Sequence, residues 1–471
     1  MQNPIISISG IRGILGKSLY PENINQFASA FAKYINKKHN ISSSAGGRIV
    51  IGRDGRLFGE QVEKIVEAAL IFNGCEVINL GIAPTPTISL AVETLKANGG
   101  IAITASHNPQ EWNGMKFINS KGIFLNKAEN DAFFKFIEDN DKDYLPWDKL
   151  KHVEYYPGFD DYHINRVLGI KCLNINRIRK RKFKVVLDCV NSSGSVIIPK
   201  LLKKLGCTII PIDCEGSGVF TRKPEPIPEN IKKTCSKVKK SKADLGIIVD
   251  PDADRLVLIT EKGEPYVEEY TIVTAINNVL KHSPAKKRIA VVNLSTTRAS
   301  DDVVKLLNGK IYKSPVGEIN VIEKMKKVGA VIGGEGSGGV ILSEVHYGRD
   351  SLVGIALILN EFTDFSGKVS DYKKTLPQYF ILKTKIPLQE GGKGDVNTQG
   401  GKGDVFNRLK KIYAAHPQNE EDGLRIDFED SWVNFRKSNT EPIIRIITEA
   451  KSKKEAKELQ KEVTHQVAVG G

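Results

Sequence analysis

The sequence predicts an α/β protein of four domains: three α/β domains with largely parallel mixed sheets covered by helices, and a C-terminal α+β domain with an antiparallel sheet. Two patterns predict this fold. Apolar segments of strand length alternate with helical segments up to about residue 372. Beyond it, strand-like segments follow one another with short connections. The length of 471 residues agrees, at roughly 100–200 residues per domain.

The first expected domain, residues 1–155, begins with a helical pattern at Pro21, because proline suits the first turn of a helix. A second helical pattern ends at Gly74, a natural C-terminal cap. Buried strands separate the helices, so both faces of the sheet should be covered. The expected strands are Arg48–Gly52, Glu76–Leu80 and Gly100–Thr104, with a further helix over Ile88–Lys96.

The same order of elements recurs in the second domain, residues 156–265, and in the third, residues 266–372, without a residue-level repeat. The fourth domain, residues 373–471, changes to consecutive strands and ends in a helix at Lys453–Gln466. The expected strands are Phe183–Val190, Cys207–Asp213, Asp244–Asp250, Arg288–Leu294, Ala330–Gly334, Phe380–Pro387, Leu424–Phe428, Ser431–Arg436 and Ile443–Glu449, and the helices are Ile197–Leu205, Ile231–Lys240 and Thr271–His282.

The chain carries a formal net charge of +14, which favours anionic partners such as nucleic acid, acidic membranes or phosphorylated metabolites. The densest basic run, Arg177–Lys182, contains no aromatic residue, and we expect a solvated loop and no nucleic-acid partner. No apolar run approaches the ~20 residues of a membrane-spanning helix. The first residues show no secretory signal. We therefore expect a cytoplasmic protein without a membrane partner.

Ser106 lies in the loop Thr104–Pro109, directly after a predicted strand. Loops at the carboxyl ends of strands line the ligand crevice of an open α/β sheet. Because Asn108 and Pro109 block a helix here, the hydroxyl can project outward, although a turn serine can also simply stabilise its own loop. With a partner that accepts its proton, Ser106 is a candidate nucleophile.

The segment Asp250–Arg255 places three carboxylates, Asp250, Asp252 and Asp254, at alternate positions after an apolar strand. In an extended loop this spacing puts all three on one side, and such oxygen ligands suit Mg²⁺. An EF-hand is excluded because Arg255 stands where its loop requires glycine. An aspartyl nucleophile of a phosphatase also fits an Asp-x-Asp pattern after a strand. The pattern favours a magnesium site.

The glycine-rich loop Gly333–Gly339 satisfies G-x-G-x-x-G, but Glu335 would repel a pyrophosphate, and the segment that follows reads as a strand. The carboxylate of Glu335 and the hydroxyl of Ser337 in a tight turn suit sugar hydroxyl groups, with a purely structural turn as the alternative. In the last domain, guanidinium, hydroxyl and amide groups cluster in an anion cradle for a phosphate, although an exposed salt-bridge turn would look similar. These cradle residues are Arg436, Ser438, Asn439, Thr440 and Arg445.

Together these loops resemble those of the α-D-phosphohexomutase superfamily, which includes phosphoglucomutase, phosphomannomutase and phosphoglucosamine mutase. The resemblance covers essentially the whole chain, and it is specific because six motifs occur in the same order. They are Ser9–Gly13, Ile51–Asp54, Thr104–Pro109, Asp250–Arg255, Gly334–Gly339 and Arg436–Pro442. Gly348–Leu352, with variants in the sugar and phosphate loops, is most similar to the branch described as phosphoglucosamine mutase.

The resemblance implies that Ser106 carries a phosphoryl group and completes a Mg²⁺ shell with the three aspartates. It further implies transfer between O6 and O1 of a hexose phosphate through a 1,6-bisphosphate, which also serves as activator, with glucosamine 6-phosphate to glucosamine 1-phosphate favoured. The same resemblance puts Glu335 and Ser337 on the sugar and the cradle on the non-reacting phosphate. It implies that Arg12, His107, Lys116 and Arg255 surround the phosphoserine.

One departure concerns the sugar loop, where many members carry a histidine and this chain has Gly339. His346, seven residues later, is a possible substitute as acid or base, although a lone histidine is more often structural. Three hypotheses remain: a phosphohexomutase for glucosamine, glucose or mannose phosphate, a Mg²⁺-dependent sugar-phosphate phosphatase, and a non-catalytic sugar-phosphate sensor or nucleic-acid binder. We expect the first, as a monomer or homodimer.

Overall fold

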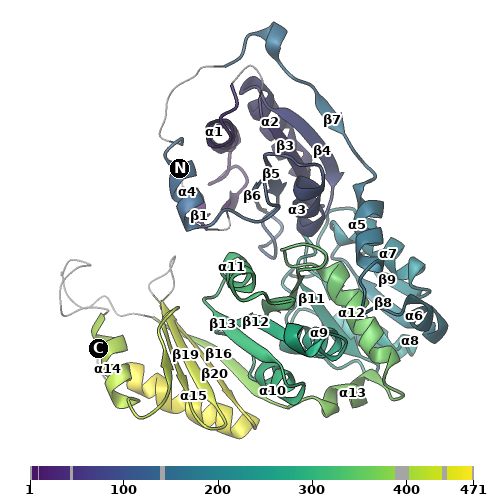
Figure 1. Ribbon diagram of the computed structural model, residues 1–471, viewed down its shortest axis with the longest axis vertical. Coiled ribbons are helices and arrows are strands. Elements are labelled where there is room, and N and C mark those ends of the chain that lie inside the picture. The colour runs from purple at the N-terminus through teal and green to yellow at the C-terminus, as the bar shows by residue number, and fades with distance from the viewer. Residues whose placement is uncertain are drawn as a thin grey trace.

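The computed structural model describes residues 3–8, 10–42, 46–137, 144–387, 403–437 and 443–468. It contains four sheets in chain order, each with its own helices, which confirms the expected fold class. Figure 1 shows the four domains in an arc, with the first at the top and the fourth at the lower left. The first and fourth domains therefore form the two ends of the arc, and the second and third connect them along one side.

The first domain is built on a seven-stranded sheet in the order β1-β2-β6-β5-β3-β4-β7. The half from β5 to β7 is parallel, whereas β1, β2 and β6 add antiparallel pairs. The strands are β1 (Ile5–Ser7), β2 (Gly10–Ile14), β3 (Arg48–Arg53), β4 (Glu76–Ile82), β5 (Gly99–Ile103), β6 (Trp112–Asn119) and β7 (Val153–Tyr155). The helices are α1 (Pro21–Lys38), α2 (Gly59–Phe72), α3 (Thr85–Thr94) and α4 (Lys127–Phe134), with a 3₁₀ turn at Trp147–Lys149.

The second and third domains each have a four-stranded mixed sheet, in the orders β11-β10-β8-β9 and β13-β12-β14-β15. In each, one antiparallel edge strand accompanies three parallel strands. The second contains α5 (Phe159–Leu168), α6 (Ile175–Arg181), β8 (Lys184–Asp188), α7 (Gly194–Lys204), β9 (Thr208–Ile212), α8 (Lys232–Ser241), β10 (Leu245–Val249) and β11 (Leu256–Thr260). The third contains α9 (Glu269–Lys281), a 3₁₀ turn (Ala285–Lys287), β12 (Ile289–Asn293), α10 (Ala299–Leu306), β13 (Lys310–Ser314), α11 (Glu318–Val328), β14 (Ile332–Glu335), β15 (Gly339–Leu342), α12 (Ser351–Thr363) and α13 (Val369–Thr375).

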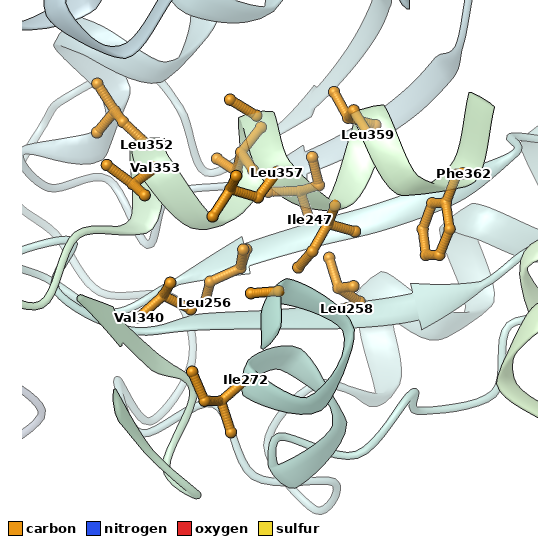
Figure 2. Close-up of a cluster of buried hydrophobic side chains, with 14 of the residues drawn as sticks. Ile247, Leu256, Leu258, Ile272, Val340, Leu352, Val353, Leu357, Leu359 and Phe362 are labelled. Atoms are coloured by element: carbon orange, nitrogen blue, oxygen red, sulfur yellow. The ribbon is translucent and has the colours of Figure 1, made fainter. Parts of the chain in front are cut away.

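The second and third domains share one hydrophobic core, part of which Figure 2 shows. Leu357 of α12 belongs to the same buried cluster as Ile247 and Leu258 of the second sheet and Val340 of the third. Domains in one chain are expected to move relative to each other unless they bury a large apolar interface. This common core packs the two domains together beneath the loops at their strand ends.

The fourth domain has an antiparallel sheet in the order β16-β20-β19-β18-β17 and its own core. Much of its junction with the third domain is polar: Arg298 donates to the carbonyl oxygens of Glu429, Phe428 and Ser431. The elements are β16 (Phe380–Pro387), α14 (Gly403–Ile412), β17 (Gln418–Asn419), β18 (Leu424–Asp427), β19 (Trp432–Lys437), β20 (Ile443–Ala450) and α15 (Lys453–Ala468).

The basic run Arg177–Lys182 is not the expected loop, because most of it forms the last turns of α6. Asn174 caps this helix, because its side-chain oxygen accepts from the backbone N–H of Arg177. The prediction of a loop considered the charges of the run and did not consider this N-cap residue. Within the described ranges, no helix combines the length and apolar character that crossing a membrane would require.

Candidate active site

Ser106 follows β5 in a left-handed conformation, with φ of +48°. Its backbone N–H donates to Thr104 Oγ1 at 2.9 Å, which closes the turn. Its hydroxyl donates to Asp250 Oδ2 at 3.1 Å, and Ser106 Oγ also lies 3.3 Å from Nδ1 of His107. A non-glycine residue held at positive φ is uncommon and marks a strained, well-supported position. The fold thus brings the serine and the first aspartate together.

Arg56, a residue to which the sequence analysis gave no role, stabilises the Ser106 loop through hydrogen bonds to its backbone. It is 2% exposed, pairs with Asp54 at 3.0 Å and donates to the carbonyl oxygens of Ser106, Asn108 and Pro109. One planar guanidinium can serve several acceptors in this way. The only sequence signal for it is its place two residues after the motif Ile51–Asp54.

Asp250, Asp252 and Asp254 are each at most 1% exposed, and one carboxylate oxygen of each lies within 4.8 Å of those of the other two. They follow β10, in a turn where Ala253 is also left-handed. Thr85 of the first domain binds the turn twice, through its N–H to the carbonyl of Asp252 at 3.0 Å and its hydroxyl to the carboxylate at 2.7 Å. The aspartates therefore sit at the junction of the first two domains.

The donor set of the triad fits a hard divalent cation. Burial and the carboxylates of Asp254 and Asp252 raise the pKa of Asp250 well above its usual range. Burial would also raise the pKa of Asp252, but the ammonium of Lys116 lowers it below its ordinary value. Oδ1 of Asp252 and Oδ1 of Asp254 accept no hydrogen bond from any described residue. Buried oxygens without donors, in a group of repelling carboxylates, are what an oxygen-coordinated ion would satisfy.

Positively charged groups surround the serine and the triad. Lys116 Nζ lies 2.6 Å from Asp252 Oδ2, and although burial opposes its charge, the two aspartates raise its pKa. Arg255 and burial hold the pKa of His107 well below its usual range. This imidazole is therefore uncharged at neutral pH, and its Nδ1 lies 3.3 Å from the Ser106 hydroxyl oxygen.

The sugar loop is the hairpin between β14 and β15. Oε1 of Glu335 accepts from Asn293 at 2.8 Å and from the N–H of Gly317 at 3.1 Å, and Oε2 accepts from Arg349 at 2.6 Å. Burial opposes ionisation, but the Arg349 guanidinium lowers the pKa of Glu335. A carboxylate has about four acceptor sites, so this anchored group keeps capacity for a ligand hydroxyl. Ser337 lies at the tip and is half-buried.

Arg349 is the second residue that the sequence analysis did not single out. It extends from the third domain to the second, where Nη2 donates to Asp254 Oδ2 at 2.6 Å. A Cβ atom on Gly339 would lie 2.3 Å from Cδ of Arg349. Arg349 thus occupies the space that a side chain at position 339 would need.

A cavity of about 1210 Å³ is lined by residues of all four domains, among them Ser106, Arg255, Glu335 and Arg445. The three aspartates do not line the cavity themselves. Each is hydrogen-bonded to a residue that does: Asp250 to Ser106, Asp252 to Lys116 and Asp254 to Arg349. Burial and the neighbouring guanidinium groups of Arg255 and Arg445 lower the pKa of Arg12, which also lines the cavity. With Arg349 of the third domain, cationic groups from all four domains line this space, as an anionic ligand requires.

The described part of the phosphate loop agrees with such a ligand. Arg436 of β19 faces Arg445 of β20 in register, and both line the cavity. Arg436 Nε pairs with Asp422 at 2.9 Å, whereas Arg445 is exposed. The predicted cradle residues Ser438, Asn439 and Thr440 lie outside the described residues, as does Ser9 of the first motif.

The structure does not bring His346 together with these groups. It is 3% exposed and lies outside the cavity lining, with Nε2 3.1 Å from Asp350 Oδ2. The same carboxylate oxygen lies 2.7 Å from His163 Nε2, and the other caps α12. Thr87 of the first domain contacts His163 at 2.9 Å, so this cluster joins three domains.

A four-domain α/β protein with a buried acidic triad at a serine, and arginines across a shared cavity, has the parts of an enzyme for phosphoryl transfer. Four family models describe the chain: phosphoglucomutase/phosphomannomutase α/β/α domain I over residues 5–143, domain II over 161–263, domain III over 268–380, and the C-terminal domain over 396–466. The chain therefore belongs to the phosphoglucomutase/phosphomannomutase family and is a phosphohexomutase.

Individual relatives are similar over almost their whole length. A phosphoglucosamine mutase of Methanocaldococcus jannaschii is 32% identical over 96% of each chain. A phosphoglucomutase/phosphomannomutase of Thermococcus kodakarensis is 33% identical over 95% of each. The solved structure of a phosphoglucomutase/phosphomannomutase family protein of Burkholderia thailandensis shares the fold, with a TM-score of 0.82 and 24% identity over 99% of this chain and 98% of the other.

Proposed function

We propose that this enzyme interconverts glucosamine 6-phosphate and glucosamine 1-phosphate through a phosphorylated Ser106 and a bound hexose 1,6-bisphosphate. The observation that carries the proposal is the 3.1 Å contact between Ser106 Oγ and Asp250 within the acidic triad. Glucosamine is the sugar in the name of the relative from M. jannaschii, whereas the T. kodakarensis relative is named for glucose and mannose phosphates. Those two sugars are the alternative substrates of the same mechanism.

In this mechanism Mg²⁺ would be held by Asp250, Asp252, Asp254 and the serine oxygen, and when bound it neutralises charge on the transferring phosphoryl group. The Ser106 oxygen gains a proton when it gives its phosphoryl group to a sugar hydroxyl, and loses it when it takes the other phosphoryl group from the sugar. His107, whose Nδ1 lies 3.3 Å from Ser106 Oγ, carries this proton, which comes from the attacking sugar hydroxyl and returns to the sugar oxygen that leaves. Lys116, Arg255 and Arg12 stabilise charge on the phosphoryl oxygens.

The other half of the site holds the substrate. Glu335 and Ser337 bind sugar hydroxyl groups, while Arg436 and Arg445, with the cradle residues after β19, bind the phosphate that is not reacting. Because both ends of a 1,6-bisphosphate carry a phosphate, the same cradle serves either orientation of the intermediate. We expect a cytoplasmic monomer or homodimer that requires a hexose 1,6-bisphosphate as activator.

Mass spectrometry of the peptide containing Ser106, after incubation with a hexose 1,6-bisphosphate, tests the proposal by an increment of one phosphoryl group. Ser106→Ala should lose both the increment and turnover, whereas the exposed Ser217→Ala should keep both. Parallel rates with glucosamine, glucose and mannose 1-phosphates identify the preferred sugar. Full turnover by Ser106→Ala would refute the mechanism, and release of inorganic phosphate without activator would favour a phosphatase.

A further inference from the structure

Two carboxylates of the acidic triad have one oxygen already bound by the protein. Oδ2 of Asp252 accepts from Lys116 Nζ at 2.6 Å and from Thr85 Oγ1 at 2.7 Å. Oδ2 of Asp254 accepts from Arg349 Nη2 at 2.6 Å. In each case Oδ1 has no hydrogen-bond donor among the residues that the structure describes. Each of these aspartates thus has a single oxygen available to a cation.

Arg349 is fixed on several sides and cannot easily turn away from Asp254. Its Nη1 donates to Glu335 Oε2 at 2.6 Å, and its Nε lies 3.1 Å from Glu318 Oε2. Its backbone N–H donates to the other Glu318 oxygen at 3.0 Å. The side chain is 10% exposed, and its Cδ occupies the space that a Cβ on Gly339 would need. These contacts hold the guanidinium against Asp254.

Divalent cations differ in how they use carboxylates. Mg²⁺ is small and demands near-octahedral geometry, whereas Ca²⁺ takes 6–8 oxygens in flexible geometry and readily accepts both oxygens of one carboxylate. A triad in which each of these aspartates offers one oxygen favours Mg²⁺, because Ca²⁺ loses the additional oxygen ligands that it prefers. At Asp254 the hydrogen bond to Oδ2 comes from Arg349, at 2.6 Å, whereas Lys116 Nζ lies 3.5 Å from the same oxygen.

We propose that Arg349 is a positioning residue that makes the acidic triad selective for Mg²⁺ over Ca²⁺, by holding Asp254 to one free oxygen. Lys116 does the same at Asp252. The proposal rests on the metal site of the proposed function, and it adds a determinant of which cation that site takes. Arg349 acts through the carboxylate and does not itself contact the ion.

The test compares the dissociation constants of Mg²⁺ and Ca²⁺ for the full-length protein freed of metal. Both follow from the rise in melting temperature with cation concentration, because a ligand that binds only the folded state stabilises it. The two ions carry the same charge, so removing the positive charge of Arg349 changes both constants by a similar factor. Their ratio therefore reports the geometry of the site and not its net charge.

The variant Arg349→Met removes the guanidinium and keeps an unbranched side chain. We expect the Ca²⁺-to-Mg²⁺ ratio of dissociation constants to fall by about 10-fold or more, within the range seen when outer partners of metal ligands are removed. Arg53→Met is the control, because Arg53 Nε pairs with Glu63 at 3.1 Å away from the cavity lining. The ratio should not change in this control.

Arg349→Lys keeps the positive charge, but a single ammonium cannot donate to Asp254 and Glu335 as the fork of arginine does. Arg349→Lys should therefore also lower the Ca²⁺-to-Mg²⁺ ratio of dissociation constants. This second variant keeps the test valid if Arg349→Met does not fold. An unchanged ratio in both variants would overturn the proposal, and if Ser106 were still phosphorylated, the proposed function would stand. Absence of any Mg²⁺ effect on the wild-type protein would instead count against the metal site of both proposals.

Discussion

Ser106 Oγ and Asp250 Oδ2 are 3.1 Å apart, although 144 positions separate the two residues and they belong to different domains. Thr85, at the start of α3, joins the two domains beside this contact by binding both the backbone and the carboxylate of Asp252. Packing of the first two domains thus builds the proposed reacting centre. The packing of the third and fourth domains adds the sugar loop and the arginines.

Substituting Ser106 separates the chemical role of this residue from its strained backbone. Ser106→Ala and Ser106→Gly should both lose phosphorylation and turnover, because neither has a nucleophilic oxygen. Glycine adopts a φ of +48° without the cost of roughly 1–2 kcal/mol that a side chain incurs there, so the glycine variant should melt at the higher temperature. A glycine variant less stable than the alanine variant would show that the left-handed turn is not strained.

Arg56 should be essential to the shape of the serine loop. Arg56→Met leaves the buried carboxylate of Asp54 without its partner and the carbonyl of Ser106 without its donor. Breaking a buried pair of this kind costs about 3–5 kcal/mol, so the urea midpoint and kcat should both fall markedly. Arg48→Met is the control, because its pair with Glu76 is exposed and such pairs contribute about 1 kcal/mol or less. Equal effects of the two variants would contradict this role.

The elements that could be predicted from the sequence are those with a local pattern. Apolar strands between helices predicted the first three sheets, and the two-residue period of Asp250, Asp252 and Asp254 predicted that they share one side of a loop. The rule that strand ends line the crevice of a sheet placed Ser106 nearby. Each inference needed only a few neighbouring residues.

Arg56 and Arg349 could not be predicted in the same way, because single arginines have no periodicity and their partners are distant. Arg349 meets Asp254 across 95 positions. Similarly, α12 is apolar on nearly all sides, and this pattern predicts that the helix is buried. No local pattern predicts that it packs against the second sheet as well as the third. His346 illustrates the reverse case, since its sequence position near the sugar loop did not imply a place in the cavity.

Glu269 should make stability depend on pH. Burial raises its pKa to about 8 from an ordinary value of 4.5. Between these values the folded protein keeps a proton that the unfolded chain has released, so stability is lost as pH rises through this window and then levels off. The free energy of unfolding of the wild type, relative to Glu269→Gln, should therefore fall by at most about 1.4 kcal/mol per pH unit.

Chemical unfolding of both proteins at several pH values between 5 and 9 measures this difference. The exposed Glu154→Gln gives the baseline for loss of an ordinary carboxylate. A difference between wild type and Glu269→Gln that stays constant across the window would mean that Glu269 is ionised in the folded protein. In that case the nearby Lys383 ammonium, 3.3 Å away, outweighs burial.

Arg445 should bind the phosphate that does not react. It lies on β20 beside Arg436, with an exposed side chain that lines the cavity and no carboxylate partner in the part of the chain that the structure describes. Arg445→Met should raise KM for the hexose phosphate by about 10- to 100-fold with a smaller change in kcat, because a contact made equally in substrate and transition state affects binding alone. The matched control is Lys451→Met, since Lys451 pairs with Asp430 at 2.5 Å outside the cavity lining. Steady-state kinetics with saturating bisphosphate activator distinguish the cases, and a fall in kcat at unchanged KM would assign Arg445 to the reacting phosphoryl group instead.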